Sequence, residues 1–288
     1  MKPCFAIEIT TPKQYQLTGL WFGPARAKRV IVFVHGLAGS AMNQRSLVYP
    51  WVDANTAVMT FGNRGHDKVT KIRRIARNKK GYVSVLAGEA HEVFTDCVDD
   101  LQGAVGFAKR AGAREIYLAG HSTGCQKSVY YASKKPDRAV SGLILLAPMS
   151  DYADAAKFQK AGNLAKATAV ARAMIRAGKK HELMPRSVWD DVLDAQRFLS
   201  LYTPDSAEEI FSYAQPKKDP VTLKKVKLPL LVIFAGEDEF EDRPTEDIAD
   251  WFEGHINEQS TVAIIPGVLH SFVGGEEKTA SVVRDWLG

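Results

Sequence analysis

The chain has 288 residues, of which 45% are hydrophobic and 25% are charged, and its formal net charge is +5. This composition is typical of a globular protein that is long enough for one large domain with an insertion. No apolar run approaches the roughly 20 residues that a membrane-spanning helix needs, so the sequence excludes a membrane span.

Cysteine usage and the first residues indicate the compartment. The three cysteines, Cys4, Cys97 and Cys125, are few and odd in number, which favours reduced thiols in the cytoplasm over a disulfide framework. The segment from Met1 to Phe5 has no apolar secretory stretch. Neither Cys-x-x-Cys nor His-Glu-x-x-His occurs, so we expect no metal site and no cofactor.

Predicted strands and helices alternate over most of the chain. Continuous apolar runs indicate strands buried on both faces of a parallel sheet, and helical spacing of apolar residues indicates the helices between them. The predicted strands are Cys4–Ile9, Gln16–Phe22, Val30–Val34, Ala57–Phe61, Glu115–Ala119, Gly142–Leu146, Pro229–Asp238 and Ser260–Ile265. The predicted helices are Asn43–Val52, Glu89–Arg110, Cys125–Lys134, Thr245–Phe252 and Lys278–Leu287. We therefore expect an α/β fold with a doubly wound, mostly parallel, eight-stranded sheet and helices on both faces.

A basic run follows the fourth predicted strand. From Arg64 to Lys80 there are eight basic residues and one acid, Asp67. Such a run is usually a solvated helix face, and the alternative is a site for an anionic ligand. We expect no nucleic-acid partner, because no recognition motif or interleaved aromatic residues accompany the charge.

A Gly-x-Ser-x-Gly pattern, Gly120 to Gly124, lies between a predicted strand and a predicted helix. A turn this tight holds Ser122 in a strained backbone conformation with its hydroxyl exposed, and a Cβ at either glycine would collide with the neighbouring strand or helix. This arrangement is typical of a nucleophile elbow. The alternative is that Ser122 only caps the helix.

The alternation of strands and helices stops between residues 150 and 227. Ala155–Ala177, Ser187–Leu201 and Ser206–Tyr213 predict helices, with Ser187 and Ser206 as candidate N-caps. The strand pattern then resumes. We therefore expect a helical lid of residues 150–227 inserted into a core of residues 1–149 and 228–288.

Two further reactive residues, Asp238 and His270, follow the last two predicted strands. Loops beyond the carboxyl ends of parallel strands face one crevice, so Ser122, Asp238 and His270 are expected to meet. A serine hydroxyl needs an imidazole to take its proton, and the imidazole needs a carboxylate to fix its tautomer. The sequence thus predicts a catalytic triad.

The predicted crevice also contains candidates for binding. The backbone N–H groups of Leu37 and Thr123 are positioned to form an oxyanion hole. Gly36, His121 and Arg64 are candidate substrate-binding residues, although His121 could serve only in packing and hydrogen bonding.

These motifs together resemble the α/β-hydrolase superfamily. The resemblance rests on His35-Gly36, the elbow, the helical insertion, Asp238 and two further strings, Asn63-Arg64-Gly65-His66 and Pro266-Gly267-x-x-His270-Ser271-Phe272. The longer string from Gly120 to Gln126 is similar to the fungal siderophore (fusarinine) esterase-like branch and its bacterial relatives. This resemblance implies a serine esterase that hydrolyses a carboxylic ester through an acyl-enzyme.

The choice of the acid in the triad stays open between two neighbours. Five acidic residues crowd the loop after the seventh predicted strand, namely Glu237, Asp238, Glu239, Glu241 and Asp242. The resemblance favours Asp238, because an apolar residue and a second Asp follow it, and Glu239 is the alternative.

The elbow alone does not fix the reaction. A lipase, thioesterase, peptidase or acyltransferase would share it, and a ligand sensor could retain the triad. We expect a small-molecule ester as substrate, and an anionic one if the basic run and the basic insertion border the crevice.

Overall fold

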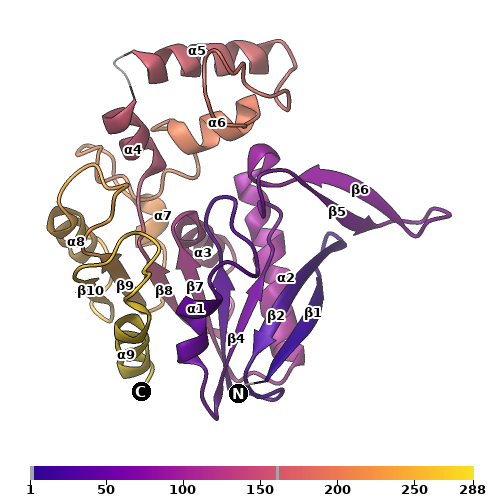
Figure 1. Ribbon diagram of the computed structural model, residues 1–288, viewed down its shortest axis with the longest axis vertical. Coiled ribbons are helices and arrows are strands. Elements are labelled where there is room, and N and C mark those ends of the chain that lie inside the picture. The colour runs from indigo at the N-terminus through magenta and orange to yellow at the C-terminus, as the bar shows by residue number, and fades with distance from the viewer. Residues whose placement is uncertain (1–2, 160–161) are drawn as a thin grey trace.

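A computed structural model of the protein describes residues 3–159 and 162–288 (Figure 1). Ten strands form one mixed sheet in the order β10-β9-β8-β7-β3-β4-β2-β5-β6, and β1 pairs with β2. The strands are β1 Cys4–Thr10, β2 Tyr15–Phe22, β3 Arg29–Val34, β4 Thr56–Phe61, β5 Thr70–Ile75, β6 Tyr82–Ala87, β7 Glu115–His121, β8 Val140–Leu146, β9 Leu230–Ala235 and β10 Thr261–Ile265. The helices are α1 Arg45–Val48, α2 Cys97–Arg110, α3 Thr123–Lys134, α4 Asp151–Phe158, α5 Asn163–Arg176, α6 Ala195–Tyr202, α7 Val221–Lys224, α8 Thr245–Glu253 and α9 Glu276–Leu287.

The parallel part of the sheet is the part that the apolar runs predicted. Strands β4, β3, β7, β8, β9 and β10 pair in parallel. Every residue of β4 and β9 is buried, because helices cover both faces of the sheet. The predicted α/β fold is therefore confirmed.

The sheet has ten strands, not the eight predicted. The two additional strands, β5 and β6, form an antiparallel hairpin. β5 lies within the basic run, which the sequence predicts to be a solvated helix face. In β5 only Ile72 is buried, and Arg73, Arg74 and Ile75 are all exposed. The strand therefore lacks the alternation of apolar and polar residues by which a half-buried strand is predicted.

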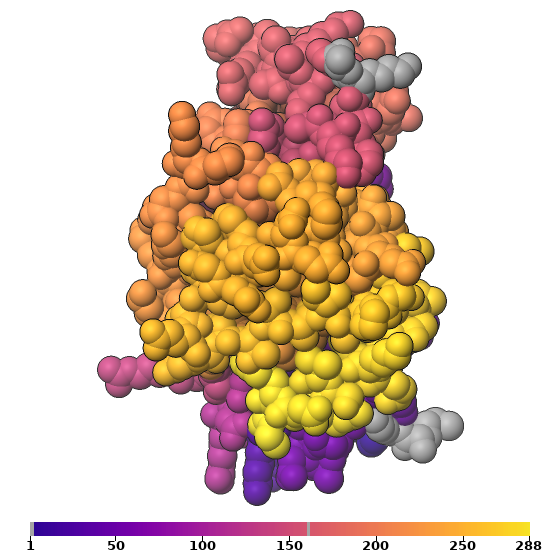
Figure 2. Space-filling model, turned by 90° about the vertical axis from the view of Figure 1, so that its left-hand side faces the viewer, coloured from indigo at the N-terminus to yellow at the C-terminus, as the bar shows by residue number. Residues whose placement is uncertain are grey.

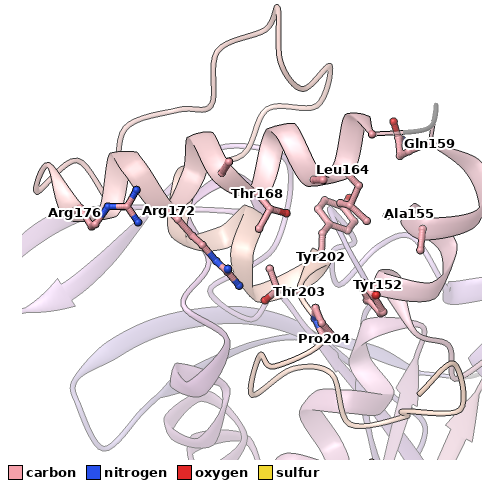
Figure 3. A pocket seen from close by; sticks show the side chains of 14 residues that line it. Tyr152, Ala155, Gln159, Leu164, Thr168, Arg172, Arg176, Tyr202, Thr203 and Pro204 are labelled. Atoms are coloured by element: carbon pink, nitrogen blue, oxygen red, sulfur yellow. The ribbon is translucent and has the colours of Figure 1, made fainter. Parts of the chain in front are cut away.

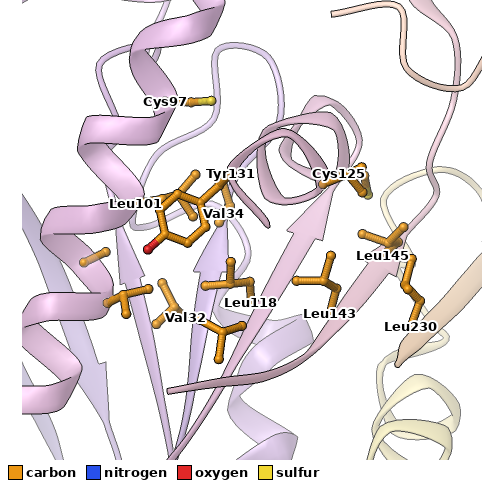
Figure 4. Close-up of a cluster of buried hydrophobic side chains, with 14 of the residues drawn as sticks. Val32, Val34, Cys97, Leu101, Leu118, Cys125, Tyr131, Leu143, Leu145 and Leu230 are labelled. Atoms are coloured by element: carbon orange, nitrogen blue, oxygen red, sulfur yellow. The ribbon is translucent and has the colours of Figure 1, made fainter. Parts of the chain in front are cut away.

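Helices from two sides enclose the core. On one face, α2 and α3 pack on the sheet through a large apolar cluster (Figure 4). Cys125 of α3 lies in this cluster, fully buried, and its thiol donates to the carbonyl oxygen of Gly120 at 3.2 Å. Cys125 therefore packs as a small buried hydrophobic residue. A second cluster on the other face includes residues of α9.

The segment between β8 and β9 holds helices α4 to α7. Figure 1 places α4, α5 and α6 beyond the carboxyl ends of the parallel strands, and Figure 2 shows this segment as the upper part of the molecular surface. A single helix over Ala155–Ala177 was expected, but α4 and α5 are separate, with Gly162 in a left-handed conformation between them. Of the helices that the structure describes, none is long and apolar enough to cross a bilayer.

Two other helix predictions in this segment are wrong in detail. The helix expected from Ser187 begins only at Ala195, because Asp194 rather than Ser187 caps it, accepting from the N–H of Arg197 at 2.8 Å. Residues 206–213 form no helix. Six consecutive residues, 208–213, are buried there, which an amphipathic surface helix cannot achieve.

Candidate active site

Ser122 occupies the sharp turn between β7 and α3. Its φ of 54° is unusual for a residue other than glycine, and this strain aims the side chain out of the turn. A Cβ on Gly120 would lie 2.3 Å from the carbonyl oxygen of Gly124, and a Cβ on Gly124 would lie 2.1 Å from that of Val34. Both glycines are therefore required by the close approach of α3 to the sheet.

His270 contacts both candidate acids, but through different atoms. Its ring Nδ1 lies 2.6 Å from Oδ2 of Asp238, whereas its backbone N–H donates to Oε2 of Glu239 at 2.9 Å. The bond to Asp238 requires Nδ1–H in the neutral ring and leaves Nε2 with a free lone pair. Of the two acids, Asp238 is thus the one that orients the imidazole.

Ser122 and His270 line the same cavity, of about 400 Å³. Gly36 and Leu37, from the loop after β3, line it as well. A Cβ on Gly36 would lie 2.8 Å from Cβ of Ser122, so this loop touches the serine. Thr123 is the first residue of α3, and the N–H groups at a helix start have no partner within the helix.

Two other histidines border the serine and are held neutral. Burial lowers the pKa of His35 to about 3, and its Nε2 accepts the N–H of Asn63 at 3.1 Å. Burial, together with the nearby His270, lowers the pKa of His121 to about 4. Nε2 of His121 donates to the carbonyl oxygen of His270 at 2.9 Å, so His121 fixes the position of the His270 backbone.

Arg64, a predicted substrate-binding residue, lies elsewhere. It does not line the cavity of Ser122. Its guanidinium is buried against three carboxylates at the start of α2 and stacks on a tyrosine ring. These partners are Asp100 at 2.7 Å, Asp99 at 3.1 Å, Asp96 at 3.3 Å and Tyr15 at 4.3 Å. With its donors already engaged, Arg64 serves to tie the loop after β4 to α2.

The cavity contains side chains that the sequence analysis missed. Asp151 and Asp154, on the first turn of α4, and Tyr202, at the end of α6, line it. Burial, reinforced by the charge of Asp238, raises the pKa of Asp154 to about 6. Asp151 comes five residues after β8, a position at the carboxyl edge of the sheet that could have been noticed.

The charged side chains around the cavity have one sign. In the part of the chain that the structure describes, Asp151 and Asp154 line it, and no lysine or arginine does. Burial also raises the pKa of Asp151 well above its ordinary value, and Nε2 of Gln126 donates to its carboxylate at 3.2 Å.

A buried ionic network joins the insertion to the core. Glu92, between β6 and α2, contacts Lys127 of α3 at 2.6 Å and Arg197 of α6 at 2.9 Å. Arg197 also pairs with Glu208, and all four side chains are buried. Although burial opposes it, the two cations hold the pKa of Glu92 below its ordinary value. The insertion is thus fixed to the core by buried charges as well as by apolar contacts.

A larger cavity, of about 660 Å³, lies within the insertion (Figure 3). Residues of α4, α5 and α6 line it, including Leu164, Thr168, Arg172 and Tyr202. Neither Ser122 nor His270 borders it, so the reactive side chains lie in the smaller cavity. Tyr202 borders both cavities.

The sheet order, the elbow and the cavity above it define the α/β-hydrolase class of fold. A model of the family described as "Protein of unknown function (DUF1749)" matches residues 80–287, and the chain belongs to this family. A search of curated proteins gives no match.

Solved structures share the fold over almost the whole chain. An esterase of Pyrococcus furiosus is 18% identical with a TM-score of 0.61, and the match covers 99% of this chain and 91% of that one. The carboxylesterase CesB of Bacillus subtilis is 17% identical with a TM-score of 0.58, covering 99% and 92%. The α/β hydrolase GrgF of Penicillium sp. sh18 is 19% identical with a TM-score of 0.62, covering 99% and 98%. The resemblance to the α/β-hydrolase superfamily is therefore confirmed at the level of the fold.

Proposed function

We propose that the protein is a serine hydrolase that cleaves carboxylic esters with Ser122, His270 and Asp238. One observation carries the proposal. The strained serine and the histidine that is bound to Asp238 open onto one cavity, although the three residues are far apart in the sequence. The reported names of similar structures, which include an esterase and a carboxylesterase, support ester bonds as the target.

The reaction follows from this arrangement. Nε2 of His270 takes the hydroxyl proton as Oγ of Ser122 attacks the ester carbonyl, and Asp238 stabilises the imidazolium that forms. The N–H groups of Leu37 and Thr123 stabilise the negative oxygen of the tetrahedral intermediate. His270 then gives the proton to the leaving alcohol. Water, activated by His270 in the same way, releases the acid from the acyl-enzyme.

We propose that residues 150–227 act as the lid of this site. Support comes from Asp151, Asp154 and Tyr202, which belong to this segment and line the cavity of Ser122. The lid therefore supplies part of the substrate pocket.

The side chains that line the cavity also determine which charge the substrate can carry. The expected preference for anionic esters depended on basic side chains at the crevice, and none lines the cavity in the described part of the chain. Asp154, whose pKa of about 6 leaves it charged at neutral pH, favours a cation and repels an anion in this cavity of low dielectric. We therefore propose a neutral or cationic ester as substrate.

Labelling with a fluorophosphonate probe, followed by mapping of the modified residue, tests the nucleophile. We expect modification of Ser122, and a loss of ester hydrolysis of roughly four to six orders of magnitude in Ser122→Ala. Ser133→Ala, further along α3, is the matched control and should keep full activity. Modification of another residue, or hydrolysis by Ser122→Ala within tenfold of the unaltered protein, would refute the proposal.

A panel of esters, thioesters and aminoacyl amides distinguishes the related reactions. We expect esters to be cleaved with the highest kcat/KM. A thioesterase, a peptidase or an acyltransferase would show a different order of preference. A single burst of product without turnover would instead identify a sensor that retains the triad.

A further inference from the structure

The β5–β6 hairpin carries the excess positive charge of the protein. Between Lys68 and Gly88 the chain has seven basic residues and no acidic one. Because the whole chain has a formal charge of +5, the remaining residues together carry −2. One element is therefore strongly basic while the rest of the molecule is slightly acidic.

This hairpin stands clear of the rest of the molecule. β5 is joined to β2 only through the pairs Tyr15–Arg74 and Gln16–Arg73, whereas it pairs with β6 over its full length. β6 is the last strand of the sheet. Figure 1 shows the hairpin projecting sideways from the body of the protein. Most of its surface is thus open to solvent.

The basic side chains of the hairpin are available to a partner. Within residues 3–159 and 162–288, Lys68 is the one member of the set that pairs with carboxylates, those of Glu89 and Asp191. The other six are all exposed at β5 or at the tip of the hairpin. Arg73 and Arg74 lie over the rings of Tyr82 and Tyr15, and the remaining four are Lys71, Arg77, Lys79 and Lys80. Their charges are not neutralised within the described part of the molecule.

Exposed aliphatic side chains lie among these charges. Val69 and Leu86 are each about half exposed and Ile75 is 40% exposed, and the pairing register places Ile75 and Leu86 on the same face of the hairpin as Lys71 and Arg73. Such side chains gain free energy by leaving water for an apolar medium. A nucleic acid offers aliphatic side chains little apolar surface to bind. Its bases stack on aromatic rings, but Tyr82, the one aromatic ring of the hairpin, is covered by the guanidinium of Arg73 at 4.8 Å. An anionic surface with an apolar layer beneath it suits both kinds of side chain.

We propose that the β5–β6 hairpin docks the protein onto a lipid bilayer with anionic headgroups. The basic side chains bind the headgroups, and the aliphatic side chains between them enter the interfacial layer. Two such signals together hold a protein at a bilayer more firmly than either one alone. The proposal does not depend on the reaction at Ser122.

Sedimentation of the full-length protein with lipid vesicles tests this proposal. The vesicles are made of phosphatidylcholine alone or with about 30% phosphatidylglycerol, at low and high salt. We expect binding to the anionic vesicles that weakens at high salt, because the charges are screened. The hairpin variant changes Lys71, Arg77, Lys79 and Lys80 to Gln, and it should bind at least about tenfold more weakly, since each basic residue contributes several-fold.

A matched control removes the same charge elsewhere. It changes four exposed residues, Lys135, Arg138, Lys166 and Lys180, to Gln, and it should keep most of the binding. A second variant, Ile75→Thr with Leu86→Gln, keeps all the charges and should also weaken binding to anionic vesicles. Both hairpin variants should hydrolyse a soluble ester as before, which shows that they fold.

Three results would overturn the proposal. One is equal binding to neutral and anionic vesicles, and another is an equal loss in the hairpin variant and the control. The third is no binding to vesicles while a duplex oligonucleotide is retarded in a gel in a hairpin-dependent way, which would make the partner a nucleic acid.

Discussion

At the scale of single residues, two adjacent acids in the loop after β9 have separate contacts with His270. Asp238 bonds to the ring, and Glu239 bonds to the backbone N–H. Only the first contact sets the tautomer of the imidazole. The second positions the loop, a role that tolerates a neutral acceptor.

We therefore expect unequal effects from removing the two charges. Asp238→Asn should lower the turnover of an ester by about 10⁴-fold, because the amide no longer favours the productive tautomer. Glu239→Gln retains an oxygen acceptor and should cost far less. Comparison of the kcat values of the two variants identifies the acid that orients the imidazole. A larger loss for Glu239→Gln would transfer the orienting role to that residue.

The pKa of Asp154 leads to a pH-dependent selectivity. Burial and the charge of Asp238 raise this pKa to about 6, so Asp154 is charged above pH 6 and neutral below it. The preference for an ester with a quaternary ammonium group over its neutral tert-butyl isostere should therefore rise as the pH increases from 5 to 8. The ratio of the two kcat/KM values measures this preference, because any effect of pH that both esters share cancels from the ratio.

Asp154→Asn should remove most of this rise. The control Asp190→Asn alters an exposed carboxylate of the insertion that does not line the cavity, and it should leave the rise intact. A ratio that stays flat with pH in the unaltered protein would show that Asp154 does not face the substrate.

At the scale of elements, the turn from β7 to α3 requires glycine because the neighbouring strand leaves no room for a side chain. Gly124 lets α3 approach β3 so closely that a Cβ at this position would lie 2.1 Å from the carbonyl oxygen of Val34. Gly106, in the middle of α2, has no such neighbour, since a Cβ there would meet only the flexible end of Arg110 at 3.4 Å. Equal substitutions at the two positions should therefore have opposite effects.

Gly124→Ala should destabilise the fold by roughly 2–4 kcal/mol, because the backbone must shift to remove the overlap. Gly106→Ala should stabilise it by about 0.5–1 kcal/mol through the higher helix propensity of alanine. Urea denaturation gives both free energies of unfolding. If the two variants were equally stable, the packing of α3 on β3 would be looser than described.

The elements that the sequence predicted well are those whose burial dominates their composition. The apolar runs of β3, β4, β7 and β9 could be assigned because both faces of each strand are covered. The β5–β6 hairpin was missed because solvent surrounds it and few of its side chains are buried. The non-helical segment around Phe211 was missed because its burial comes from tertiary packing, which helix propensity does not predict.

The candidate site, like the fold, could be predicted only in part. Ser122, Asp238 and His270 each follow a strand, so the sheet itself indicates where they meet. Asp154 and Tyr202 come from the insertion, whose position over the cavity depends on contacts between distant side chains. Arg64 was misjudged because its carboxylate partners lie on the far side of the hairpin in sequence.

At the scale of the whole molecule, the buried network around Glu92 determines how firmly the insertion is held. Arg197 is fully buried between Glu92 and Glu208. Removing it would leave Glu208 without its cation and Glu92 with Lys127 alone, in a medium of low dielectric. The insertion should then loosen from the core.

Arg197→Met should lower the free energy of unfolding by about 3–5 kcal/mol, the range for breaking a buried ion pair from one side. Limited proteolysis should then cut within residues 150–227 before it cuts the core. Arg172→Gln is the control, because Arg172 is half exposed and lies 3.8 Å from Asp205; it should change stability by no more than about 0.5 kcal/mol. Unchanged proteolysis of Arg197→Met would mean that apolar contacts alone hold the insertion.

The position of β9 and β10 at one end of the sheet bears on how the protein is made. During synthesis on the ribosome, strands β1 to β8 and the elbow of Ser122 emerge first, and the insertion follows. β9 and β10 come last and can add to the free edge of β8 without threading through structure that is already in place. Asp238 and His270 arrive only with these strands. A nascent chain that ends before Leu230 would therefore hold Ser122 in its turn but lack His270, so that under the proposed mechanism hydrolysis would begin only as synthesis finishes.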